Sequence, residues 1–271
     1  MEVDDLERID SIRSELEKRS DDRRQRYGRF TLSALAAIPW VGGVLSAISA
    51  LDAEHSQAEV NALQQQWLEE HRQKINHLGQ TMAEILARLE GLGETAAERL
   101  EEESYLGLVE QGFRIWDQSG TEEKRQLVQR LLTNAGATRL SSDDVVRLFL
   151  DWIDSYHEIH FSVIRVVYNN PGITRAEMWD EISGAEVRDD SPEADLFKLM
   201  IRDLSTGSVL RQARDTDEHG RFYRKRHRDS RGAFLASPFE NTKPYVLTEL
   251  GRQFVHYAMD EVVPRIGSED D

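Results

Sequence analysis

The stretch VNALQQQWLEEHRQKINHLGQTMAEILARL, residues 60–89, gives the strongest indication of the fold. It contains no proline, and its apolar stripe recurs about every 3.6 residues, which is the period of a straight α-helix. We predict one long helix over residues 43–90, ended by Gly91 and Gly93. A helix of that length needs a partner along its face, either the following helices or a second copy of the chain. The stripe consists of Val60, Leu63, Trp67, His71, Ile75, Leu78, Met82, Ile85 and Leu89.

Three shorter helices follow, each predicted from residues that favour a helix start. Thr95 and Ser141 are each followed three residues later by an acidic side chain, which is the spacing of a capping box. Thr121 precedes two glutamates and follows a break at Ser119–Gly120, so it is the predicted cap of the middle helix. Together with the long helix, these elements predict an elongated helical bundle over residues 30–153.

The two ends of the chain are strongly charged. Residues 1–29 mix acidic and basic side chains, with Leu6, Ile9, Ile12 and Leu16 on one helical stripe. We predict an exposed charged helix there, and the early charges do not fit a secretion signal. Residues 265–271 are predicted to be an acidic tail.

Residues 30–51 carry no charged side chain over 22 positions, about the length that crosses a bilayer. Pro39, Gly42 and Gly43 interrupt the run and weaken a single helix. Three interpretations stay open: a membrane span, a surface or conditional insertion, and a buried helix–turn–helix in a bundle. The candidate membrane or oligomer residues are Phe30, Leu35, Ile38, Trp40, Val41, Leu45 and Ile48.

The C-terminal part, residues 154–264, has a different pattern. Three short helices are followed by three strand-like runs and a last helix, with Thr174, Ser191 and Thr248 as predicted helix caps. Pro192 follows Ser191 at the first helical position, which proline favours.

This order of elements resembles a bacterial winged helix-turn-helix domain over residues 155–263. The resemblance is carried by PGITRAEMWDEI at 171–182, SPEADLFKLMIRDL at 191–204 and YVLTELGRQF at 245–254. It implies a recognition helix at 191–204 and either DNA binding or protein joining. The predicted fold class is therefore mainly α, with a helical bundle and a C-terminal winged-helix domain that has a small β-wing.

Charge divides this predicted domain. Residues 191–204 carry a net −1 and residues 174–190 a net −4, whereas residues 221–231 carry a net +5. The acidic helices argue against major-groove reading, and the arginine-rich wing favours phosphate contact. The alternatives are a solvated loop or a basic patch that docks on the chain's own acids or on a partner. The predicted nucleic-acid-binding residues are Arg211, Arg214, Arg221, Tyr223, Arg224, Lys225, Arg226, Arg228 and Arg231.

Motifs for catalysis are weak. The chain has no cysteine, which excludes thiol nucleophiles, disulfides and cysteine zinc sites. His157 and His160 lie three residues apart, one too few for a zincin pair. Asp52 with His55, and Asp154 with His157, have a spacing found in di-metal bundles, but 50 acids make such pairs expected by chance. We predict no metal and no cofactor.

These observations predict a cytoplasmic, non-enzymatic interaction or assembly protein. Its winged-helix module would contact DNA or RNA through the wing, or a protein partner, and the long helix would join copies of the chain or a partner protein. One alternative is a membrane-inserting, toxin-like effector, for example in phage defence, that uses residues 30–51. Another is a helical metalloenzyme that uses Asp52, His55, Asp154 and His157.

Overall fold

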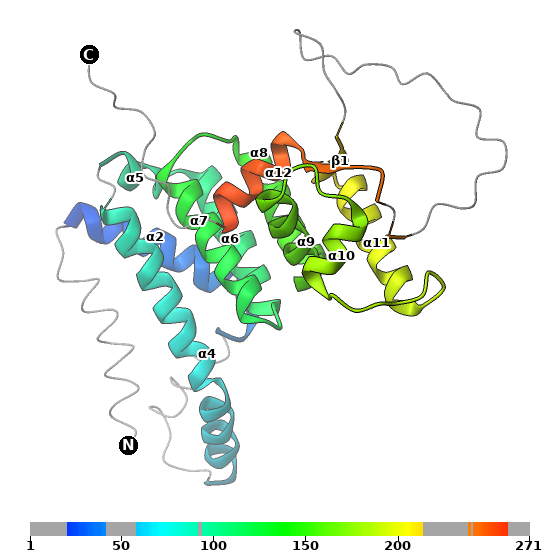
Figure 1. Ribbon diagram of the computed structural model, residues 1–271. Coiled ribbons are helices and arrows are strands. Elements are labelled where there is room, and N and C mark those ends of the chain that lie inside the picture. The colour runs from blue at the N-terminus through cyan, green and yellow to red at the C-terminus, as the bar shows by residue number, and fades with distance from the viewer. Residues whose placement is uncertain (1–20, 42–57, 92–93, 214–237, 240, 260–271) are drawn as a thin grey trace, which may run out of the picture. The chain divides into compact units, whose positions relative to one another are not determined.

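The computed structural model describes residues 21–41, 58–91, 94–213, 238–239 and 241–259 (Figure 1). These residues are mainly helical, with one two-stranded sheet. The chain divides into two compact units. Unit 1 comprises residues 1–155 and 257–271, and unit 2 comprises residues 156–256.

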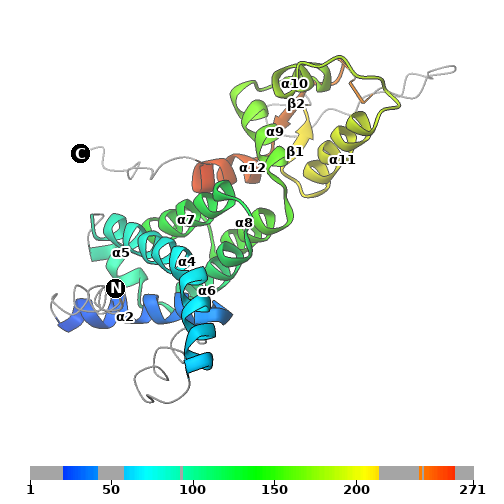
Figure 2. The ribbon, with the colours of Figure 1, turned by 90° about the horizontal axis from the view of Figure 1, so that it is seen from below.

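Unit 1 is a bundle in which α6 has the central place. This helix packs against α2, α7 and α8, while α4 packs on α7 and α5 (Figure 2). The helices of unit 1 are α2 (Asp21–Ala36), α4 (Ala58–Gly91), α5 (Glu94–Arg99), α6 (Glu103–Gln118), α7 (Glu122–Ala137) and α8 (Asp143–Ser155).

The core of unit 1 forms on the apolar face of α6. Tyr105, Leu108, Val109 and Phe113 are all fully buried, and Phe30 of α2 meets Phe113 edge to face. Each such aliphatic or aromatic side chain contributes about 1.5–3 kcal/mol when it leaves water. The bundle is therefore held by burial along α6, as the apolar periodicity predicts.

Several helix boundaries differ from their predictions. The single helix predicted from the capping box at Thr95 is two helices, because α5 ends at Arg99 and α6 begins only at Glu103. Helix α8 begins at Asp143, and the backbone N–H of Ser141 instead donates to the Tyr257 hydroxyl. The break at Ser119–Gly120 and the cap position of Thr121 are confirmed.

The long helix is confirmed from Ala58 to Gly91, and positions 43–57 of the prediction lie outside the described residues. Helix α2 runs without a break across position 30, where the predicted charged segment 1–29 meets the apolar segment. Residues 1–20 and the predicted acidic tail 265–271 also lie outside the described residues.

The described residues of unit 2 form three helices, a small sheet and a further helix. Strands β1 and β2 pair antiparallel, with Leu210 opposite Leu247 and Gln212 opposite Tyr245. Tyr245 also bridges Ile173, which lies between the first two helices of the unit. The elements are α9 (Glu158–Asn169), α10 (Arg175–Ile182), α11 (Pro192–Thr206), β1 (Leu210–Gln212), β2 (Tyr245–Leu247) and α12 (Glu249–Phe254). Helix α12 continues as a π-helical turn, η1 (Val255–Met259), whose residues from Tyr257 onward belong to unit 1.

All three predicted helix caps of unit 2 are confirmed. The Thr174 hydroxyl accepts from the Glu177 backbone, and the Glu177 carboxylate accepts from the Thr174 N–H at 2.8 Å. Ser191 caps α11 with Pro192 at its first position, and the Thr248 hydroxyl accepts from the Gly251 N–H at 2.9 Å. Each cap satisfies backbone donors that a helix start leaves unpaired.

Candidate functional site

The predicted nucleic-acid site lies largely outside the described residues. Arg211 is described: it is half-buried at the centre of β1, opposite Val246. Its eight predicted companions fall within residues 214–237, which the structure does not describe. The second of the three predicted strand-like runs, residues 221–226, lies in the same stretch.

The two ends of this stretch have defined positions. At its start, the backbone N–H of Ala213 donates to the Pro244 carbonyl at 2.8 Å, so the β1–β2 pairing continues to Ala213. Beyond its end, the Phe239 ring stacks on Phe197 of α11 at 5.8 Å and lies 5.2 Å from the Trp179 ring of α10. In the sequence, Phe239 follows the last predicted basic residue, Arg231, by eight positions.

Helix α11 occupies the position of the predicted recognition helix. Its inner face is apolar and buried, and its outer face carries two exposed leucines, Leu196 and Leu199, among charged side chains. Asp195 and Arg202 lie on that exposed side. A helix that reads bases uses hydrogen-bonding and cationic side chains there, so this composition does not favour major-groove reading.

The region before α11 is acidic, and some of its carboxylates accept hydrogen bonds from neighbouring residues. The Glu177 carboxylate belongs to the cap of α10, and its hydrogen bonds to Thr174 lower its pKa. Asp190 accepts two hydrogen bonds from the Arg188 guanidinium at 2.8 Å, which lower its pKa. Asp180 and Glu181 are exposed and would repel phosphate at this side of the unit.

The candidate membrane or oligomer residues are part of the bundle where they are described. Phe30, Ile38 and Val41 are buried, Leu35 is half-buried, and the Trp40 Nε1 donates to Asp117 at 2.6 Å. Leu45 and Ile48 lie outside the described residues. Helix α2 ends at Ala36, so residues 30–41 do not belong to one continuous helix. In the part of the chain that is described, no helix is both long enough and apolar enough to cross a membrane.

The two neighbouring histidines serve the start of α9. The backbone N–H of His157 donates to Nδ1 of His160 at 3.1 Å, so His160 satisfies a donor at the helix start. His160 is buried, stacks on Tyr156 and has its Nε2 4.0 Å from an Asp203 oxygen. Burial and the charge of Asp203 raise the pKa of Tyr156 to about 12.

Among the described residues, no group of histidine and acidic side chains could hold a metal ion. Asp154 and His157 are therefore not part of a metal-binding group there. Asp52 and His55 lie outside the described residues.

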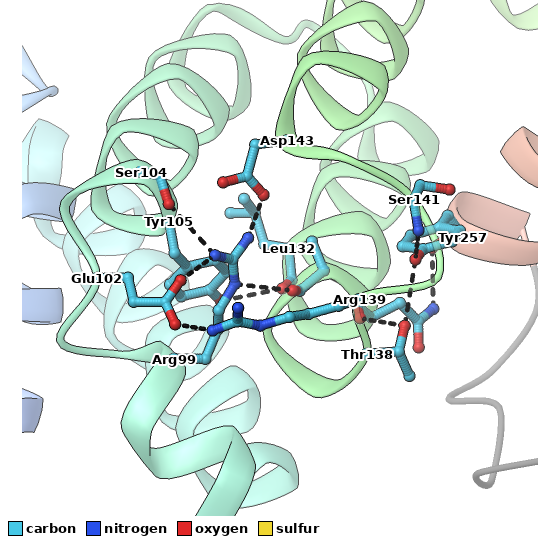
Figure 3. A network of polar contacts seen from close by, with 12 residues as sticks. Arg99, Glu102, Ser104, Tyr105, Leu132, Thr138, Arg139, Ser141, Asp143 and Tyr257 are labelled. Atoms are coloured by element: carbon cyan, nitrogen blue, oxygen red, sulfur yellow. Dashed lines mark hydrogen bonds and ion pairs between the residues drawn. The ribbon is translucent and has the colours of Figure 1, made fainter. Parts of the chain in front are cut away.

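The main polar cluster of unit 1 was not indicated by any sequence pattern (Figure 3). We call it the Arg99 cluster: Arg99, Glu102, Ser104, Arg139 and Asp143. The Arg99 guanidinium is buried, and each of its three nitrogens donates: Nε to the Ala135 carbonyl, Nη1 to Glu102 and Ser104, and Nη2 to Asp143. Arg139 contacts the other oxygen of Glu102, so two arginines balance two carboxylates.

The electrostatics of the cluster favour its ionised form. Burial opposes the charge on Asp143, but hydrogen bonds from Arg99 and Ser104 outweigh it and lower the pKa of this carboxyl. Burial raises the pKa of the neighbouring Tyr105 hydroxyl, which donates to the Leu132 carbonyl at 3.0 Å. Because its charges are paired with one another, the cluster joins α5, α6, α7 and α8.

Tyr257 makes a second set of contacts beside this cluster, also in unit 1. Its carbonyl accepts from the Asn134 side chain at 2.9 Å, and its hydroxyl accepts from the Ser141 N–H and lies 3.2 Å from the Thr138 hydroxyl (Figure 3). These contacts fix the α7–α8 connection to η1.

Comparisons of the chain with protein-family models, curated proteins and solved structures find no match.

Proposed function

We propose that the chain is a non-enzymatic interaction protein whose unit 2 is a winged-helix module. The supporting observation is the strand arrangement: Ile173 between α9 and α10, β1 after α11, and β2 after the undescribed stretch. Tyr245 of β2 pairs with both Gln212 and Ile173, so three strand positions meet in the order that a winged helix has. In this interpretation the predicted basic wing, residues 221–231, lies in the sequence between β1 and β2.

The wing is the proposed contact to nucleic acid. Residues 221–231 carry five net positive charges, mostly from arginine, which binds phosphate through paired donors. Helix α11 presents leucines and an aspartate instead. The module would therefore hold the backbone of DNA or RNA through the wing without reading bases through α11.

Unit 1 is the proposed assembly part. Helix α4 has 34 residues and α7 has 16, so α4 is about 27 Å longer at 1.5 Å per residue. The described contacts between them lie in the second half of α4, from His77 with Glu122 to Glu84 with Gln129. In both ribbon views the first turns of α4 extend past α7 (Figures 1 and 2). The first half of α4 would pack on a partner protein or on a second copy of the chain.

Fluorescence anisotropy with a labelled DNA duplex and a labelled single-stranded RNA tests the wing. At about 50 mM salt we expect the full chain to bind, and R224E/K225E/R226E/R228E to bind at least about 100-fold more weakly. The control is R188E, which reverses an exposed charge in the loop before α11 and should change affinity less than about threefold. Absence of binding by the unaltered chain, or an equal loss in R188E, contradicts the proposed contact.

A further inference from the structure

The outer face of α11 carries an ordered stripe of acidic, apolar and basic side chains that the proposed wing contact does not involve. Asp195, Leu199, Arg202 and Thr206 follow one another at spacings of four, three and four, so they lie along one side of the helix. The buried side chains Ala194, Phe197, Met200, Ile201 and Leu204 occupy the opposite side. From start to end, the outer stripe therefore presents an acid, a leucine and a base.

The leucines of this face are unusually exposed. Leu199 has 39% of its surface accessible, and Leu196, one turn earlier on the flank of the stripe, has 50%. Arg202 is also well exposed, and its contact to Asp203 within the same helix is 3.8 Å long. An exposed ion pair of that length contributes little, so it would be exchanged readily for a better partner.

We propose that α11 is a self-association surface whose occupant is α11 of a second copy of this chain, packed antiparallel about a two-fold axis. With the axis between positions 198 and 199, Asp195 of each copy faces Arg202 of the other. Leu199 of each copy then lies beside Leu199 of the other, with Leu196 on one flank and the exposed Lys198 on the other. A two-fold interface requires a self-complementary surface, and an acid–leucine–base stripe has that property only in the antiparallel orientation.

The charges also decide against other occupants. A parallel pair would place Asp195 against Asp195 and Arg202 against Arg202, which is repulsive. A nucleic acid would meet Asp195 and two leucines where it needs cationic and hydrogen-bonding groups. The area of one helix face is below that of a stable dimer, so the association is weak and concentration-dependent.

Charge exchange tests the pairing directly. In sedimentation velocity of the full chain, we expect D195R and R202D each to weaken self-association at least about tenfold, since two attractive contacts become repulsive. Mixing the two variants, or combining them in one chain, should restore it, because an introduced arginine then faces an introduced aspartate across the axis. Both positions are exposed, and thermal melts of the variants should match the unaltered chain.

A cysteine cross-link gives a second, independent test, because the chain has no cysteine of its own. L199C should form a covalent dimer under mild oxidation or with a short bismaleimide. L140C is the matched control: Leu140 is a 67% exposed leucine in unit 1. The proposal is wrong if L140C cross-links as fast as L199C. It is also wrong if the charge exchanges leave self-association unchanged, or if the unaltered chain is monomeric at all concentrations. None of these outcomes depends on nucleic-acid binding, so the two proposals fail separately.

Discussion

The two units use charged side chains in opposite ways. In unit 1 the Arg99 guanidinium is 7% exposed and lies between Glu102 and Asp143, so its charge holds helices together. In unit 2 the comparable pair of Arg188 with Asp190 is 85% and 70% exposed and links neighbours in one loop. Charge that is buried and paired is committed to the fold, whereas charge on the surface is available to a partner.

The largest effect expected from this comparison is the loss of Arg99. R99M removes the guanidinium and leaves two carboxylates near each other without their main donor, which should cost about 3–5 kcal/mol of unfolding free energy. Urea unfolding measures the loss, and hydrogen exchange should show it in α5–α8. The control R188M removes the exposed pair and should leave the unfolding free energy nearly unchanged. Equal costs for the two variants would remove the distinction between the units.

A close backbone approach in unit 2 gives the next effect. A Cβ at Gly251 would lie 2.4 Å from the Val209 carbonyl oxygen. Because this oxygen belongs to the backbone, it cannot move aside as the end of a flexible side chain could. We therefore expect G251A to destabilise unit 2 by about 1–3 kcal/mol.

The control is G28A in α2, where nothing lies within 4 Å of the added carbon. In a helix interior this change should stabilise by about 0.5–1 kcal/mol. Thermal unfolding that shows the same sign for both variants contradicts the packing described around Gly251.

The smallest effect expected is a pH dependence that comes from the Arg99 cluster of unit 1. The pKa of Asp143 is lowered in the folded state, so its contribution is present above the ordinary value of 3.8 and is lost as pH falls below it. Between about pH 5 and pH 2, D143N should show a shallower loss of stability than the unaltered chain. Parallel curves for the two proteins would show that Asp143 has the same pKa in the folded and unfolded states.

How much could be predicted from the sequence also differs between the units. Thr174 with Glu177, Ser191 with Pro192, and Thr248 act within one helical turn, and all three caps are confirmed. Local contacts of this kind leave a fixed spacing that a sequence shows directly.

The missed features of unit 1 depend on residues far apart in the chain. The α5–α6 break lies beside Arg99, whose partner Asp143 is 44 positions away, and Ser141 is bound by Tyr257, 116 positions away. No spacing rule connects such positions, so tertiary contacts override the cap roles predicted for Thr95 and Ser141. The basic residues 221–231 remain a prediction from composition, because they lie outside the described residues.

The salt dependence of nucleic-acid binding tests the central claim most directly, namely that the positive charge of residues 221–231 contacts phosphate. We predict that the logarithm of the association constant for a DNA duplex falls linearly with the logarithm of salt concentration. The slope should become shallower by about 3–4 in R224E/K225E/R226E/R228E, since each lost phosphate contact removes about 0.9. The same slope in both proteins, or no binding by the unaltered chain at about 50 mM salt, would contradict the account.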